Sequence, residues 1–154
     1  MKELSIRARA PAASSALVRH VMVANYGGNT TPERLLRSAL RRVGLKFRRE
    51  GQVIPNLRCK ADVVFPAERV CVFVDGCFWH GCHLHFSVPK THSSWWREKV
   101  EDNRRRDRRN TARLRAAGWK VIRIWEHAIA PDSMALVLER IGSAVRQRSG
   151  PRRR

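Results

Sequence analysis

The segment DGCFWHGCHLHF, residues 75–86, holds two cysteines, three histidines, an aspartate and three aromatic side chains. Cys77, Cys82 and His85 are five and three residues apart, so one short loop could bring all three to a single ion. Thiolate and imidazole are the ligands of structural zinc, which takes four of them. The same residues could instead be buried thiols and exposed histidines, but their clustering favours zinc. The candidates for the fourth ligand are His127, which follows the run VIRIWE, and then His83 or His80.

Carboxylates close to this segment could serve phosphodiester chemistry. Asp62 lies in the run KADVVF, one hairpin away from the run that leads into Asp75 and His80. Acidic residues on adjacent strands can hold a hard divalent cation against a phosphodiester, and a histidine beside it can take a proton from water. The alternative is that Asp62 is a turn residue at the start of a strand.

Two pairs of aromatic residues flank the same segment: Phe78–Trp79 and Trp95–Trp96. Exposed aromatic side chains beside basic residues stack on bases or wedge between them. The alternative is a place in the core, which we expect for at least one tryptophan of each pair. A domain of this size cannot easily bury both pairs completely.

The rest of the chain predicts an α-β-β-α-β-α order of elements. Apolar β-branched runs predict the strands, and helical spacing with Pro32, Gly44 and Gly118 at the ends predicts the helices. The predicted elements are a helix from Thr31 to Gly44, paired strands at Lys60–Phe65 and Arg69–Gly76, a helix at Ser93–Ala117, a strand at Trp119–His127 and a helix at Pro131–Arg148. This order is typical of a single α/β domain with a small mixed sheet flanked by helices.

Polar residues on the inward faces of the helices are further candidates for the site. Glu33 shares the face of the predicted buried stripe formed by Leu36, Leu40 and Val43. It is either a first-turn charge that suits the helix dipole, which the helix alone favours, or a group that faces an interior site. The last helix has its own apolar face, formed by Met134, Leu138, Ile141 and Val145.

The long helix has an inward face with apolar ends and a polar middle, where Asn103 and Asp107 lie. An inward aspartate either pairs with an interior arginine, which is the commoner case, or faces a polar site. The many arginines around it can extend outward to phosphates. The residues along this face are Trp96, Val100, Asn103, Asp107, Thr111 and Leu114.

The charge of the chain indicates a polyanionic partner. The sequence has 154 residues, 32 Lys and Arg against 13 Asp and Glu, and a net charge of +19. Nucleic acid is the first expectation because each neutralised phosphate releases counterions. No apolar run approaches the roughly 20 residues of a membrane span, and the N-terminal stretch has no secretion signal, so we expect a cytoplasmic, nucleoid-associated protein. Cys59 and Cys71 are expected to be buried thiols.

Several long motifs resemble the very short patch repair (Vsr-type) DNA mismatch endonucleases. They are NTTPE, ADVVF, VFVDGCFWHGC, VPKTHSSWWREKVEDNRRRDRR and LRAAGWKVIRIWE, in the family's order and at matching intervals. The resemblance covers about Arg19 to Ala130. We therefore expect a flexible arm at residues 1–18, the endonuclease domain at 19–147 and a disordered basic tail at 148–154.

The resemblance implies a restriction-endonuclease-like α/β fold and a Mg²⁺-dependent nick in duplex DNA, 5′ to the T of a T:G mismatch that arises from deaminated 5-methylcytosine. The family's metal-binding aspartate falls on Asp62 and its catalytic histidine on His80, while Val74 would supply a backbone carbonyl to Mg²⁺. Glu33 and Asp107 match acidic residues of the family's site, which reverses the preference for a plain helix charge at Glu33. Asp75 stands where some members carry a histidine and is assigned a supporting contact near the metal or the phosphate.

The resemblance also implies the DNA-binding and zinc residues. The wall that intercalates beside the mismatch falls on Phe78, Trp79 and Trp96, with Met22 entering from the minor groove. Lys90, Arg97 and Lys99 are assigned to DNA contact. The zinc site falls on Cys77, Cys82, His85 and His127; at the last position the family often has a cysteine after WE, but histidine also binds zinc.

Two other functions fit part of the pattern. A zinc-stabilised DNA-binding module without catalysis needs the basic residues and the zinc ligands, but neither Asp62 nor His80. A restriction-type nuclease would use the same fold on matched DNA, without a preference for mismatches. The expected protein is monomeric, with duplex DNA as its partner and DNA-repair proteins as further partners.

Overall fold

The computed structural model describes residues 29–150, which form three helices, four strands and one turn of 3-10 helix. The predicted order of elements is confirmed, with one further strand between the first helix and the hairpin. The elements are α2 (Thr31–Arg42), β1 (Arg48–Gln52), β2 (Lys60–Phe65), β3 (Val70–Asp75), α3 (Ser93–Ala116), β4 (Lys120–Trp125), η1 (Glu126–Ala128) and α4 (Met134–Ser149).

The four strands form one mixed sheet in the order β1-β2-β3-β4. β2 and β3 are the predicted hairpin, paired antiparallel with Val63 opposite Val72. β3 and β4 are parallel, and α3 makes the crossover between them, so the strand ends at Asp75 and Trp125 lie side by side. β1 was not predicted because its sequence RREGQ is polar and largely exposed, without the apolar alternation of a strand.

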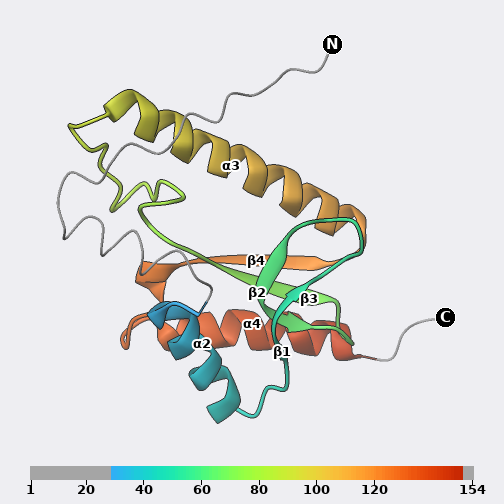
Figure 1. Ribbon diagram of the computed structural model, residues 1–154. Helices are drawn as coiled ribbons and strands as arrows, with labels where there is room; N and C mark the ends of the chain where they lie inside the picture. Colours follow the sequence, from blue (N-terminus) through green and yellow to red (C-terminus); the bar gives the residue numbers. More distant parts are fainter. Residues whose placement is uncertain (1–28, 151–154) are drawn as a thin grey trace.

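The helices cover both faces of the sheet, α3 on one and α2 with α4 on the other (Figure 1). The larger core packs Leu36 of α2 and Ile141 of α4 against strand residues such as Val72. The smaller core packs Leu114 of α3 against Phe73 and Val121. This α/β arrangement confirms the predicted fold class.

Two details of the predicted helices are wrong. Val43, expected in the buried stripe of α2, is 55% exposed because the helix ends at Arg42 and the chain turns away there. α4 continues through Ser149, two residues into the segment assigned to the tail, and Arg148 donates a hydrogen bond to the Gly118 carbonyl (2.8 Å). No described helix is long and apolar enough to cross a membrane.

Candidate active site

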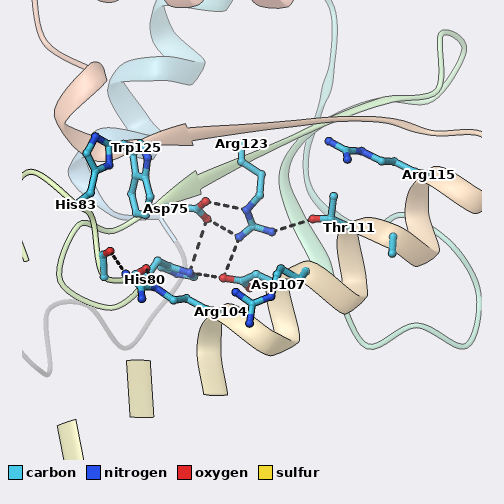
Figure 2. A pocket seen from close by; sticks show the side chains of 12 residues that line it. Asp75, His80, His83, Arg104, Asp107, Thr111, Arg115, Arg123 and Trp125 are labelled. Carbon is cyan, nitrogen blue, oxygen red and sulfur yellow. Dashed lines mark hydrogen bonds and ion pairs between the residues drawn. The ribbon is translucent and has the colours of Figure 1, made fainter. Parts of the chain in front are cut away.

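An open cleft of about 540 Å³ lies between α3 and β4, at the end of the two parallel strands. Asp75 enters it from the end of β3, Asp107 from α3 and Arg123 from β4, while His80 comes from the loop after β3 (Figure 2). The ends of parallel strands are where α/β proteins commonly bind ligands. Three of the predicted catalytic residues, Asp75, His80 and Asp107, therefore share one cleft.

His80 is held by Asp107. Its Nδ1 lies 2.5 Å from Asp107 Oδ2 and 3.9 Å from Asp75 Oδ1. Burial alone would raise the pKa of Asp107, but the hydrogen bond and charge of His80, together with the charge of Arg123, outweigh it and lower that pKa. An ionised Asp107 accepts a hydrogen bond from the Nδ1–H of His80, which leaves Nε2 as the nitrogen that can take a proton from water.

Arg123 was not predicted as a site residue, yet it contacts both carboxylates. Its Nε and Nη2 donate to the two oxygens of Asp75 at 2.7 and 2.5 Å, and Nη2 also lies 3.3 Å from Asp107 Oδ2. The prediction that Asp107 would either pair with an interior arginine or face a polar site is met in both respects. The signal in the sequence was a lone arginine inside the apolar run KVIRIW, which requires an acidic partner when it is buried.

Asp62 and Glu33 form a second acidic group beside the first. Asp62 does not belong to the cluster of Asp75, His80 and Asp107, whose ligand atoms lie within 4.8 Å of one another. Asp62 Oδ2 accepts a hydrogen bond from the N–H of Val74 (2.7 Å). The predicted Mg²⁺ residues Asp62 and Val74 are thus in direct contact.

Glu33 lies in the first turn of α2, where its carboxylate contacts the two residues that precede the helix. It accepts hydrogen bonds from the Asn29 N–H (2.6 Å) and the Thr30 hydroxyl (3.0 Å) and pairs with Arg37 (3.5 Å). Arg37 in turn donates to the Asp62 carbonyl (3.4 Å). Thr30 is the N-cap residue, directly before the predicted start of the helix at Thr31. The first-turn role of Glu33 is therefore visible in its contacts, and its catalytic role stays a prediction.

The carboxyl of Asp62 is poised to change its protonation state near neutral pH. Burial raises its pKa to about 7, the charge of Glu33 adds to the rise, and the hydrogen bond from Val74 opposes it. A nearby cation would stabilise the ionised form of the Asp62 carboxyl and lower its pKa.

Four predicted ligands meet beside β3: three come from the loop after that strand and the fourth, His127, comes from η1. The sulfur of Cys77 lies 3.2 Å from His127 Nδ1 and 3.9 Å from His85 Nδ1, and that of Cys82 lies 3.6 and 3.7 Å from the same atoms. Tetrahedral zinc with Zn–S of about 2.3 Å and Zn–N of about 2.0–2.1 Å places S and N about 3.5 Å apart. The observed distances fit that geometry. His80 and His83, the alternative fourth ligands, lie outside this group.

The same loop is fastened to the rest of the molecule through its backbone. The N–H of Cys77 donates to Glu126 (2.7 Å), and Asn103 of α3 donates to the Trp79 carbonyl (2.8 Å). Arg104 donates to the carbonyls of His80 (3.2 Å) and Gly81. Gly81 has φ +64°, and a Cβ there would lie 2.6 Å from both Val100 and Arg104. Only glycine suits this approach of the loop to α3.

The predicted DNA-contacting wall is a cluster of aromatic rings at the start of α3. Phe78 packs edge-on against Trp79 (5.4 Å between centroids) and Trp96 (5.1 Å). Trp96 is only 6% exposed, so it supports Phe78 and Trp79 from behind, as expected for one tryptophan of the pair. Its predicted contact with DNA therefore does not agree with its position here.

The predicted basic contacts are on the outside. Lys90, Arg97 and Lys99 are exposed, and no carboxylate in residues 29–150 pairs with them. They are therefore free to contact phosphates. Met22 lies outside the residues that the structure describes.

Comparison with known proteins identifies the family. The family model described as DNA mismatch endonuclease Vsr matches residues 14–85. The type II nicking enzyme V.NaeI of Lentzea aerocolonigenes is 41% identical over 120 residues, which are 77% of this chain and 72% of that protein. V.XorIIP of Xanthomonas oryzae pv. oryzae is 40% identical over 110 residues (70% and 78%), and DNA mismatch endonuclease Vsr of Escherichia coli is 39% identical over 102 residues (66% and 64%). The chain therefore belongs to the Vsr family of DNA mismatch endonucleases, and it is a DNA endonuclease.

Proposed function

We propose that this endonuclease nicks duplex DNA 5′ to the T of a T:G mismatch, with Mg²⁺ as its catalytic ion and His80 as its general base. The observation that carries the proposal is the contact of His80 Nδ1 with Asp107, because it fixes the ring in a cleft with Nε2 left to act. Nε2 takes a proton from water, the water oxygen attacks the phosphorus, and the bond to the leaving oxygen breaks.

Asp62 and the Val74 carbonyl would hold the Mg²⁺ ion, which supplies charge stabilisation at the phosphate and the leaving oxygen. The pKa of Asp62 is raised to about 7 by burial and by the charge of a second acid, Glu33. A bound cation would offset the cost of ionising this carboxyl. Hard oxygen donors on the end of a sheet also suit Mg²⁺ better than the softer thiolate and imidazole cluster next to them.

We further propose that Cys77, Cys82, His85 and His127 hold structural zinc. Two thiolates and two imidazoles complete the ligand set of a closed tetrahedral site. Burial raises the pKa of Cys77 to about 11, so that thiol needs a bound cation to become a ligand at neutral pH. His80, Phe78 and Trp79 lie on the loop that this zinc site would hold rigid. Zinc binding would therefore fix the positions of these three side chains relative to the DNA.

Mismatch preference would come from the aromatic residues on that loop. Phe78 and Trp79 are partly exposed and supported from behind by Trp96. A rigid aromatic wedge unstacks a base step at a cost of a few kcal/mol, and this cost is lowest where pairing is already weak, as in a T:G wobble.

A nicking assay tests the proposal. Matched, T:G and other mismatched duplexes of one flanking sequence are incubated with the zinc-loaded enzyme, with Mg²⁺ added or omitted. We expect Mg²⁺-dependent cutting of one strand of the T:G duplex and much slower cutting of the matched one. Equal cutting of all duplexes would support a restriction-type nuclease instead, and binding without cutting would support a DNA-binding module. Sedimentation in the same buffer tests the proposed monomer.

A further inference from the structure

Among residues 29–150, Arg123 is the basic side chain that forms ion pairs with both acidic residues around His80. Both oxygens of Asp75 are occupied by its guanidinium, in the bidentate geometry that arginine forms with carboxylates. The same guanidinium reaches Asp107 (3.3 Å) and the Thr111 hydroxyl (3.4 Å), and it lies over the Phe73 ring at 4.9 Å. Its place is therefore fixed from β3 and α3 at once (Figure 2).

The contacts of Arg123 determine which carboxylate accepts the hydrogen bond from His80 Nδ1. His80 Nδ1 lies between two carboxylates, Asp107 at 2.5 Å and Asp75 at 3.9 Å. Asp75 is a weaker acceptor than a free carboxylate because the guanidinium engages one lone pair on each of its oxygens and balances its negative charge. If Arg123 were removed, Asp75 would become a second acceptor for the imidazole and a second unbalanced negative charge beside it.

We infer that Arg123 is a positioning residue for this reaction: it engages Asp75 so that His80 has one acceptor, Asp107, and it holds Asp107 in place through the same guanidinium. This inference rests on the proposed role of His80. It changes the assignment of Asp75, whose role becomes that of the anchor of Arg123.

A positioning role for Arg123 and a purely structural role, in which it only joins α3 to the sheet, predict different results. In Arg123→Gln, both carboxylates are free, and the Nδ1–H of His80 alternates between Asp75 and Asp107 as its hydrogen-bond acceptor. In the double variant Asp75→Asn with Arg123→Gln, the competing carboxylate is gone as well. A purely structural role predicts that the double variant is no better than Arg123→Gln, because it has lost a further contact. Competition for His80 predicts that the double variant recovers.

The test compares wild type, both of these variants, Arg123→Lys and the control Arg146→Gln. Arg146 is an exposed arginine of α4 that pairs with Glu139 (2.9 Å) and lies outside the cleft. The measurements are the single-turnover nicking rate with saturating enzyme, the Kd for the uncut duplex and the thermal stability. Arg123→Lys keeps the charge but cannot form the bidentate contact, so it should fall between wild type and Arg123→Gln.

We expect Arg123→Gln to lower the nicking rate about 100-fold, the effect of an approximately 1 Å misplacement of a reacting group, with little change in Kd. The double variant should cut about tenfold faster than Arg123→Gln, a difference of about 1.4 kcal/mol in activation free energy. Arg146→Gln should cut like wild type. A rate for Arg123→Gln close to that of wild type, or a double variant slower than the single one, would overturn the inference.

Two further measurements keep the result interpretable. If Arg123→Gln does not fold, Asp75→Asn alone decides: the inference predicts moderate loss, and complete loss of cutting at unchanged Kd would place Asp75 in the chemistry. NMR of histidine-labelled protein reads the Nδ1–H signal of His80 without any substrate. That signal should be sharp and strongly downfield in wild type and should weaken in Arg123→Gln, even if the substrate proposed above is wrong. An unchanged signal in Arg123→Gln would overturn the inference.

Discussion

Replacing Asp62 by asparagine should stabilise the fold at neutral pH while it removes the proposed Mg²⁺ ligand. Burial raises the pKa of Asp62 to about 7 from its ordinary 3.8, with Glu33 adding to the rise. An acid that binds its proton more tightly in the folded chain than in the unfolded one makes folding less favourable once it must ionise. Asparagine carries no charge, and its oxygen can still accept the Val74 hydrogen bond.

The size and the pH window follow from the two pKa values. Below pH 3.8 Asp62 is protonated in both states, so its burial costs nothing extra. As the pH rises from 3.8 to about 7, the unfolded chain ionises first and wild type loses stability. Above about pH 7 the loss is constant, at about 4 kcal/mol for about three pKa units. That is a large part of the 5–15 kcal/mol by which a typical domain is stable.

Urea unfolding of the zinc-loaded proteins without Mg²⁺ checks this prediction across that pH range. The stability advantage of Asp62→Asn should grow from near zero at the acid end to its full value above pH 7. The matched control is Asp102→Asn, an exposed aspartate of α3 whose change should stay within about 0.5 kcal/mol. Added Mg²⁺ should stabilise wild type and leave Asp62→Asn unchanged. An advantage that is absent, or the same at every pH, would refute the reasoning about Asp62.

Three other predictions concern the loop after β3. Cys82→Ser should lower the zinc content and the Tm, measured by elemental analysis and thermal melts, and full zinc retention would contradict the proposed site. Gly81→Ala should cost about 2–4 kcal/mol in denaturant unfolding, since its Cβ would lie 2.6 Å from Val100 at φ +64°; an unchanged midpoint would show that the loop can move away. Trp79→Ala should lower the ratio of nicking rates on T:G and matched duplexes, and an unchanged ratio would argue against its role as a wedge.

Much of the fold could be predicted because its elements obey local rules. The hairpin at Lys60–Phe65 and Val70–Asp75 was visible as two β-branched runs around a proline turn, and the end of α3 as Gly118. The clustering of the four proposed zinc ligands was predictable because three of them lie within one short loop. β1 was not, since an exposed edge strand gains its order from pairing with β2 and needs no apolar pattern of its own.

The site could be predicted only as far as its motifs extend. The roles proposed for His80 and Asp107 came from the resemblance, and the structure adds the contact between them. Arg123 was missed because its partners Asp75 and Asp107 lie on other elements and meet it only through the parallel pairing of β3 and β4. The state of Asp62 was equally invisible, because a raised pKa depends on burial and on Glu33 from α2, not on the strand that carries it.

We propose that His80, oriented by Asp107, carries the chemistry of this endonuclease. The most direct test of this proposal is the single-turnover nicking of a T:G duplex with Mg²⁺ by wild type and His80→Ala, alongside the Kd for the same duplex. The control is His92→Asn, at an exposed histidine with φ +56°, a backbone conformation that asparagine tolerates. We expect His80→Ala to lose cutting and keep its DNA affinity, while His92→Asn retains both. Undiminished cutting by His80→Ala would contradict the proposal.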